Sequence, residues 1–370
     1  MRFALILLSP FLPLMGWYLY TLLKGILQLF GLEWKGKRKL LLIGAAILLL
    51  TVAALSDLGL LFLLHFTVLG LLTCFVKLIL KAFRKKKEPQ KNSLWEKIYR
   101  SGAIPLMLTL GIMLFGYLNL HTVVRTDYTV ATQKKIREEG YRIVLIADVH
   151  FGVSLDEEAL FEKCEEINAT DPDLVVLCGD LADNSTTKEG MLAMLRAFGT
   201  LESELGTYFV FGNHDRSMSM VSNRFTEEEL RRAMEESGIK ILQDTTLQLT
   251  EDLVLIGRED RSRRNRASLA SLTEGLSSDD FWLVLDHQPN EYNENGALGT
   301  DLLLSGHTHG GQFFPVNLLM ELIPFNDATY GAYSLSNGGT AIVTSGFAGW
   351  NFPLKTAAPA EYAIIEVLPS

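Results

Sequence analysis

The first 120 residues of the chain contain four long apolar runs, and this feature limits the possible folds more than any other. The runs are Phe3–Leu23, Leu40–Ser56, Leu58–Val76 and Ala103–Leu120, with 21, 17, 19 and 18 residues. A helix needs about 20 apolar residues to cross a hydrocarbon core of about 30 Å. We therefore predict a membrane domain over residues 1–125 with about four transmembrane helices, of which the second is marginal in length.

Basic residues between these runs predict an orientation. Residues 24–39 hold five Lys and Arg, residues 77–100 hold nine, and the connection around Asp57 holds none. The positive-inside rule places both basic segments in the cytoplasm. With four spans, the chain after Leu120 lies outside, which predicts a multi-pass protein of the cell membrane with an extracytoplasmic domain. If the second run does not span, the inferred side inverts.

Charge separates this apolar region from the rest of the chain. Residues 1–130 hold 16 Lys and Arg against 5 Asp and Glu, whereas residues 131–370 hold 18 against 38, a net charge of −20. A domain this acidic repels phosphate polyanions, so we expect no nucleic-acid partner. With 48% apolar residues and only three cysteines, the chain is neither disordered nor a disulfide scaffold.

Short apolar runs alternate with amphipathic segments after residue 141, which is typical of a layered α/β sandwich. Ser154 with Glu157, and Thr226 with Glu229, have the spacing of a capping box and predict two helix starts. A third helix is predicted near Lys188–Phe198. The predicted strands are Arg142–Ala147, Leu174–Cys178, Thr207–Phe211, Leu253–Ile256, Phe281–Leu285, Leu302–Leu304, Ala341–Thr344 and Tyr362–Val367.

Polar residues follow five of these strands directly. All five histidines beyond residue 130 lie in such clusters, together with acidic and amide side chains. In open α/β folds, ligands gather at the carboxyl ends of strands, so the clusters are expected to meet at one site. Imidazole with carboxylate is a ligand mixture that suits Zn, Mn or Fe. The clusters are Asp148-Val-His150, Gly179-Asp180, Gly212-Asn213-His214-Asp215, Asp286-His287 and Gly306-His307-Thr-His309.

These clusters resemble, in order and spacing, the five motifs of the calcineurin-like metallophosphoesterases. The intervals are 32 residues from Asp148 to Asp180, 33 from Asp180 to Asn213, and 20 from His287 to His307. The resemblance covers residues 126–370 and implies a four-layer α/β/β/α sandwich there. The Gly306–Gln312 segment and the preceding spans look most like the bacterial membrane-anchored branch, which is similar to UDP-2,3-diacylglucosamine pyrophosphatases and cell-envelope phosphodiesterases.

The resemblance implies two divalent metal ions, with Mn, Zn and Fe as candidates, and assigns their ligands. Asp180 would bridge, because a shared carboxylate can hold two cations about 3.5–4 Å apart, where they clamp a phosphoryl group and activate water. One metal would take Asp148, His150, Asp180 and His309, and the other Asp180, Asn213, His287 and His307.

The same resemblance gives His214 a catalytic role and does not make it a metal ligand. It would stabilise the transition state or protonate the leaving oxygen, and Asp215 would orient its ring or raise its pKa. Asp286 is either an acceptor that orients His287 or an exposed acid.

Two further features have an ordinary and a functional interpretation. Five arginines, at 258, 261, 263, 264 and 266, form either a solvated loop or a clamp for an anionic head group. The aromatic residues Phe347, Trp350 and Phe352, with Phe313 and Phe314, form either ordinary core or the lining of a groove for an acyl chain. The specific substrate-binding residues are not identified by the sequence.

The sequence thus predicts a membrane-anchored, dinuclear metal-dependent phosphohydrolase. Its substrate would be a phosphodiester or diphosphate of the cell envelope or of a lipid, and this substrate could be amphiphilic. Its partner would be the lipid bilayer. One alternative is a glycolipid enzyme like the UDP-2,3-diacylglucosamine pyrophosphatases. Others are a non-catalytic metal-binding membrane module, which should lack ligands, and a transporter or sensor, which should have ionisable residues in its spans, where only His65 is found.

Overall fold

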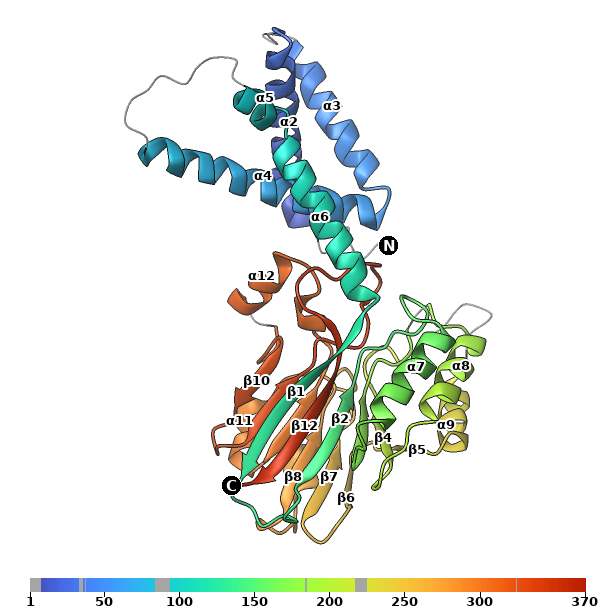
Figure 1. The fold of residues 1–370 in the computed structure, drawn as a ribbon. Coiled ribbons are helices and arrows are strands. Elements are labelled where there is room, and N and C mark those ends of the chain that lie inside the picture. The colour runs from blue at the N-terminus through green and yellow to red at the C-terminus, as the bar shows by residue number, and fades with distance from the viewer. Residues whose placement is uncertain are drawn as a thin grey trace. The chain divides into compact units, whose positions relative to one another are not determined.

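The computed structural model describes residues 8–32, 36, 38–83, 94–183, 185–216, 225–323 and 325–370. The chain divides into two compact units, Met1–Gly116 and Tyr117–Ser370 (Figure 1). The start of the first apolar run and much of the predicted cytoplasmic charge, at residues 33–35, 37 and 84–93, lie outside the described residues. The orientation therefore depends on the sequence alone.

The first unit is helical, as its apolar runs predict. Within the described part of the chain, two helices are long and apolar enough to cross a membrane, α4 with 27 residues and α6 with 18. The prediction of about four spans is thus supported for two runs only. Helix α3 has 16 residues, which is about 24 Å at 1.5 Å per residue and short of the hydrocarbon core. Helix α2 contains Lys24 and two glycines. The elements are η1 (Ser9–Phe11), α2 (Leu12–Leu29), α3 (Arg38–Ala53), α4 (Asp57–Phe83), α5 (Leu94–Arg100) and α6 (Ala103–Leu120).

The second unit contains two six-stranded mixed sheets. The first has the strand order β1-β12-β2-β3-β4-β5 and the second β10-β11-β9-β8-β7-β6. Strands β2 to β5 are parallel to one another, as are β7, β8, β9 and β11, so their carboxyl ends share one edge in each sheet. The strands are β1 (Val123–Thr132), β2 (Tyr141–Ile146), β3 (Leu174–Cys178), β4 (Thr207–Val210), β5 (Ile239–Ile241), β6 (Thr245–Gln248), β7 (Leu253–Gly257), β8 (Phe281–Leu285), β9 (Leu302–Ser305), β10 (Gly331–Ser334), β11 (Thr340–Val343) and β12 (Ala360–Pro369).

Three layers of buried side chains hold this unit together and confirm the four-layer sandwich. One apolar cluster joins the first sheet to helices α7, α8 and α9, a second fills the space between the two sheets, and a third joins the second sheet to α10 and α11. Alternate residues of β2 face opposite clusters, Val144 the helices and Ile143 the other sheet. The helices are α7 (Glu157–Asn168), α8 (Lys188–Phe198), α9 (Glu227–Glu236), α10 (Leu269–Leu272), α11 (Tyr292–Leu298), η2 (His309–Gly311) and α12 (Val316–Leu322).

The sequence misplaced a few boundaries. Thr226 and Glu229 form the predicted capping box, but α7 is capped by Asp156, whose side chain accepts from the amide of Ala159, rather than by Ser154. Strands β1, β5, β6 and β10 were not predicted. The expected domain boundary at residues 125–126 falls inside β1, which pairs in parallel with β12 along its whole length.

Candidate metal centre

The predicted site residues lie in the turns that leave five neighbouring strands. Five of them have a positive φ: Asp148 (54°), His150 (41°), Asp180 (54°), His307 (72°) and His309 (51°). They are half of the ten non-glycine residues with this backbone conformation in the described part of the chain. Such a conformation is costly for L-residues and tends to collect at functional sites.

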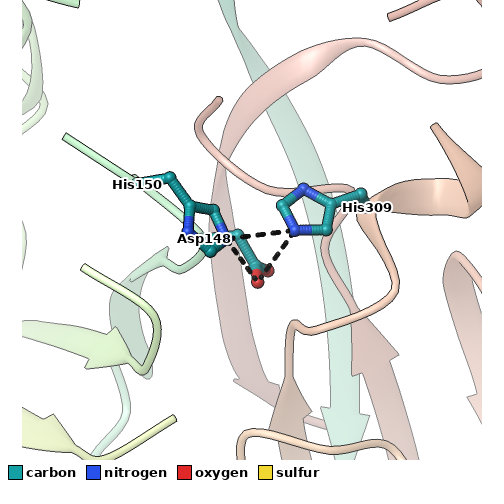
Figure 2. A group of neighbouring side chains, drawn as sticks. All are labelled: Asp148, His150 and His309. Carbon is teal, nitrogen blue, oxygen red and sulfur yellow. Dashed lines mark hydrogen bonds and ion pairs between the residues drawn. The ribbon is translucent and has the colours of Figure 1, made fainter. Parts of the chain in front are cut away.

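Asp148, His150 and His309 form the first group, which Figure 2 shows as three side chains converging on one point. Their ligand atoms all lie within 4.8 Å of one another. The Nε2 atoms of His150 and His309 are 3.2 Å apart, and Nε2 of His309 lies 3.5 Å from Oδ1 of Asp148. All three side chains are buried.

Asp180, His287 and His307 form the second group, again with ligand atoms within 4.8 Å of one another. Oδ2 of Asp180 lies 3.1 Å from Nε2 of His287. The same oxygen lies 3.9 Å from Nε2 of His150 in the first group. One carboxylate oxygen therefore stands between the two groups, in the place that a bridging ligand needs.

Two side-chain oxygens of the predicted ligands are buried without a hydrogen-bond partner among the described residues. They are Oδ1 of Asp148 and Oδ1 of Asn213. An unpaired polar atom in the interior costs roughly 1–3 kcal/mol, so each of them indicates a missing binding partner. Oxygen and nitrogen ligands of this kind fit divalent transition metals. The two groups therefore fit two metal ions, and the assignment of Asn213 to the second group stays a prediction.

Burial and mutual charge perturb the pKa values in both groups. Burial raises the pKa of Asp148 to about 6 and lowers that of His307 to about 4. Burial and the nearby His150 hold the pKa of His309 well below its ordinary value. For His287, the lowering effect of burial is outweighed by Asp180 and Asp148, which raise the pKa well above the usual range. The lowered pKa values of His307 and His309 favour the neutral imidazole that a metal ligand needs, whereas the raised pKa of His287 favours a charged ring, which would have to lose its proton to bind a metal.

Glycine is required where the turns approach one another. A Cβ on Gly212 would lie 2.2 Å from Oδ1 of Asp180 and 2.5 Å from its amide nitrogen. Gly179, with φ of 83°, would place a Cβ 2.5 Å from Nδ1 of His287. The absence of side chains at these positions lets the turns after β3 and β4 touch.

Asp215 has a different role from the one expected. Its Oδ2 accepts the amides of Asp180 (2.8 Å) and Gly212 (2.7 Å), and its Oδ1 accepts those of Leu181 (2.8 Å) and Ala182 (3.1 Å). No hydrogen bond joins Asp215 to His214 within the described ranges. We correct the expectation accordingly: Asp215 fixes the backbone that carries Asp180 and does not orient the His214 ring.

Two orienting groups were missed by the sequence analysis. Oδ2 of Asp183 lies 3.6 Å from Nδ1 of His150, which directs the other ring nitrogen to the first group. The sequence contains a feature that could have identified this residue, because Asp183 is a carboxylate only three residues after the predicted ligand Asp180. The backbone oxygen of Cys178 accepts from Nδ1 of His287 at 2.8 Å, and no side-chain pattern reveals a carbonyl.

His214 lies beside the first group. Its ring centroid is 5.4 Å from that of His150 and 5.0 Å from that of Trp350, and burial lowers its pKa. Of the predicted aromatic groove, Trp350 is thus next to the site. Phe347 belongs to the core between the first sheet and its helices, and Phe352 packs against Phe313, so these follow the ordinary interpretation.

The arginine cluster does not act as a single clamp. Arg258 is buried and Arg266 partly buried, and both pair with Asp286 and Glu291, whereas Arg261, Arg263 and Arg264 are exposed. Asp286 is accordingly a buried ion-pair partner, neither the exposed acid nor the acceptor for His287. Lys355, also missed, is fully buried and donates to the carbonyl oxygens of Ser345 and Gly346.

A two-sheet sandwich with carboxylates and histidines at its strand ends defines a metal-dependent hydrolase domain. Comparison with known proteins agrees: residues 141–311 match the model of the calcineurin-like phosphoesterase family, and this range includes every predicted metal and catalytic residue. Residues 141–311 are therefore similar to the calcineurin-like phosphoesterase family.

Similar full-length proteins include an uncharacterized metallophosphoesterase of Campylobacter jejuni, 28% identical over 79% of this chain and 75% of that protein. A transmembrane protein with metallophosphoesterase domain from Danio rerio is 28% identical over 71% of this chain and 62% of its own length. An uncharacterized metallophosphoesterase from Helicobacter pylori is 30% identical over 63% of this chain and 61% of that protein. The chain thus spans about three fifths of the last two. A solved dimetal phosphatase from Danio rerio is 14% identical, covering 55% of this chain and 87% of that one, with a TM-score of 0.31.

Proposed function

We propose that the protein is a membrane-anchored phosphohydrolase that uses two divalent metal ions to cleave a phosphodiester or diphosphate of the cell envelope. The observation that carries the proposal is the position of Asp180, whose Oδ2 lies 3.1 Å from His287 and 3.9 Å from His150. Asp148 and His309 complete one ligand set, and Asn213 and His307 the other.

When bound, two such ions polarise the phosphoryl oxygens and lower the pKa of water towards about 7. The side chains and backbone of the protein orient the metal ligands and provide a proton donor. Asp183 and the Cys178 carbonyl orient His150 and His287, and Asp215 fixes the turn that carries Asp180. His214, partly exposed beside the first group, donates a proton to the leaving oxygen, and its lowered pKa makes the protonated ring a stronger acid.

Helix α6 supports both anchoring and sidedness. It is one of the two described helices that can cross a bilayer, and it follows a segment, residues 77–100, with nine Lys and Arg. If that segment is cytoplasmic, a crossing by α6 alone puts the domain that follows on the outer side. The inference therefore does not depend on the second apolar run, contrary to the condition stated from the sequence. An outer domain favours an envelope substrate.

The test is hydrolysis by the full-length protein in detergent with Mn²⁺, using a generic aryl phosphodiester and the matching monoester, with metal content measured in parallel. We expect diester cleavage in the wild type and loss of both cleavage and metal in Asp180→Asn. The matched control is Asp301→Asn, because Asp301 lies at the opposite end of β9 from the site, where its carboxylate accepts the amide of Trp282 at 2.9 Å and lies 3.7 Å from Nζ of Lys134. That variant should keep both properties.

Other outcomes separate the alternatives. A normal metal content in purified Asp180→Asn would exclude the bridging role. Bound metal without turnover of either ester would exclude generic diesterase activity and leave a more specialised substrate. Neither metal nor turnover would favour a non-catalytic module.

A further inference from the structure

One apolar surface of the second unit faces solvent. Helix α12 and the residues after it expose Leu318 (45%), Leu319 (36%), Leu322 (77%), Ile323 (62%) and Phe325 (80%). We call these five residues the α12 surface. Isolated apolar side chains are common on protein surfaces, but a contiguous group of large ones marks a contact site.

The α12 surface is mounted on the turns that carry the candidate metal ligands. Helix α12 begins five residues after η2, whose first residue is His309, and the amide of Asn317 donates to the carbonyl oxygen of Phe313 at 3.0 Å. Beyond the surface, the amide of Asp327 donates to the carbonyl oxygen of Pro289, two residues after His287, at 3.0 Å. The surface is thus held at both ends by the loops of the two ligand groups.

The end of the candidate span α6 is fastened to the same part of the unit. The side-chain nitrogen of Asn119 donates to the carbonyl oxygens of Lys355 and Ala358, both at 2.8 Å. Between these two residues, the hydroxyl of Thr356 accepts from the amide of Phe314, just before α12, at 3.1 Å. One short segment, residues 355–358, therefore holds both the last turn of α6 and the base of α12. In Figure 1, α12 accordingly lies at the end of the sandwich where α6 joins β1.

We propose that the α12 surface inserts into the boundary between head groups and acyl chains of the bilayer that α6 crosses. Apolar side chains of a short surface helix bind lipid in this way. Residues 316–325 contain no Lys or Arg, so the contact is hydrophobic and does not require anionic lipid. The inference about the substrate rests on the proposed function: the metal centre would bind the phosphate group of an amphiphilic molecule at the membrane surface.

The test uses the full chain in phosphatidylcholine vesicles, with Cys74→Ser removing the one exposed cysteine among the three in the chain. An environment-sensitive fluorophore is attached at Leu322→Cys and, as the matched control, at Asp279→Cys, which is exposed just before the start of β8 at the opposite end of that strand from His287. We expect blue-shifted emission and quenching by a lipid-borne quencher at position 322 only. The emission should be the same when anionic lipid is added.

Two results would overturn the proposal. Aqueous emission at position 322 means that the surface does not enter lipid. Blue-shifted emission without lipid quenching means that protein covers it, either a second copy or another segment of this chain.

A kinetic test addresses the substrate separately. Leu322→Ser combined with Phe325→Ser should lower turnover of a vesicle-embedded lipid phosphodiester several-fold and leave turnover of a soluble aryl diester unchanged. Equal effects on both would refute the substrate inference. If the wild type cleaves neither ester, the proposed function fails, while the fluorescence result still decides the membrane contact.

Discussion

Asp215→Asn is the substitution that best separates a structural from a catalytic role for this buried carboxylate. The two oxygens of Asp215 accept four backbone amides, two each, at 2.7–3.1 Å. An asparagine amide has only one accepting oxygen. Whichever way it is turned, its NH₂ group faces two N–H donors, which lose their partner at a buried position.

The cost follows from these contacts. A buried donor left without a partner costs about 1–3 kcal/mol, so two cost about 2–6 kcal/mol. For a domain of some 150–250 residues, each kcal/mol lowers Tm by about 2–4 °C, which gives a decrease of about 4–24 °C. Because the displaced amides include that of Asp180, metal content should fall as well.

The assay is thermal unfolding of the metal-free full-length protein, with Asp279→Asn as an exposed carboxylate control that should leave Tm unchanged. A Tm for Asp215→Asn within about 2 °C of the wild type, together with a displaced pH–rate profile, would refute this reasoning. It would restore the role that the family resemblance first suggested, in which Asp215 acts on His214.

Three further predictions use other parts of the site. His214→Gln should lower turnover about 100-fold or more with unchanged metal content, as expected for a proton donor that is not a ligand; loss of metal would contradict this. Gly212→Ala should reduce metal content and destabilise the domain by about 1–3 kcal/mol, because its Cβ would lie 2.2 Å from Oδ1 of Asp180; full metal occupancy at wild-type stability would show that the turns can separate. Lys355→Met tests a buried charge whose pKa burial lowers from 10.5 to about 7. Between those values the unfolded chain holds a proton that the folded chain has released, so wild-type stability should rise with pH relative to the variant by up to about 1.4 kcal/mol per pH unit, measured by urea unfolding from pH 6 to 9. Parallel curves would mean that Lys355 titrates normally.

The sequence predicted the strands that carry the site because these are short, fully buried and apolar. Strand β3 and strand β8 have the predicted bounds, and the residues after them could be named as ligands. Strand β1 was missed because polar residues fill its middle and only three of its ten residues are buried. Its strand character depends on pairing with β12, more than 230 residues away.

The membrane region shows a different limit. Apolar runs are visible in the sequence, but the length of the helix that each run forms depends on where it is interrupted. Asp57 begins a 27-residue helix that continues past Val76 to Phe83, whereas the preceding run yields 16 helical residues. The sequence indicated about four spans, of which the second was marginal, and the described residues contain two helices that are long and apolar enough.

The roles of individual site residues were harder to predict, because they depend on which oxygen points where. The sequence spacing predicted that Asp148 and Asp180 lie in the metal site. In the structure, one oxygen of each carboxylate accepts a backbone amide and the other faces the ligand groups. Oδ2 of Asp148 accepts the amide of His307 at 2.8 Å and leaves Oδ1 unpaired. Oδ1 of Asp180 accepts the amide of His214 at 2.7 Å and leaves Oδ2 between His150 and His287.

This division links the ligand groups to one another. The carboxylate of Asp148, in the first group, positions the backbone of His307, in the second, and Asp180 positions His214 beside the first group. A carboxylate can do both tasks because both of its oxygens accept. An amide in its place can hold the neighbouring turn or face the ligand groups, but not both. Positions 148 and 180 therefore require aspartate for two reasons: one oxygen holds a neighbouring loop, and the other carries charge to the ligand groups. Either reason considered alone would not have predicted both contacts.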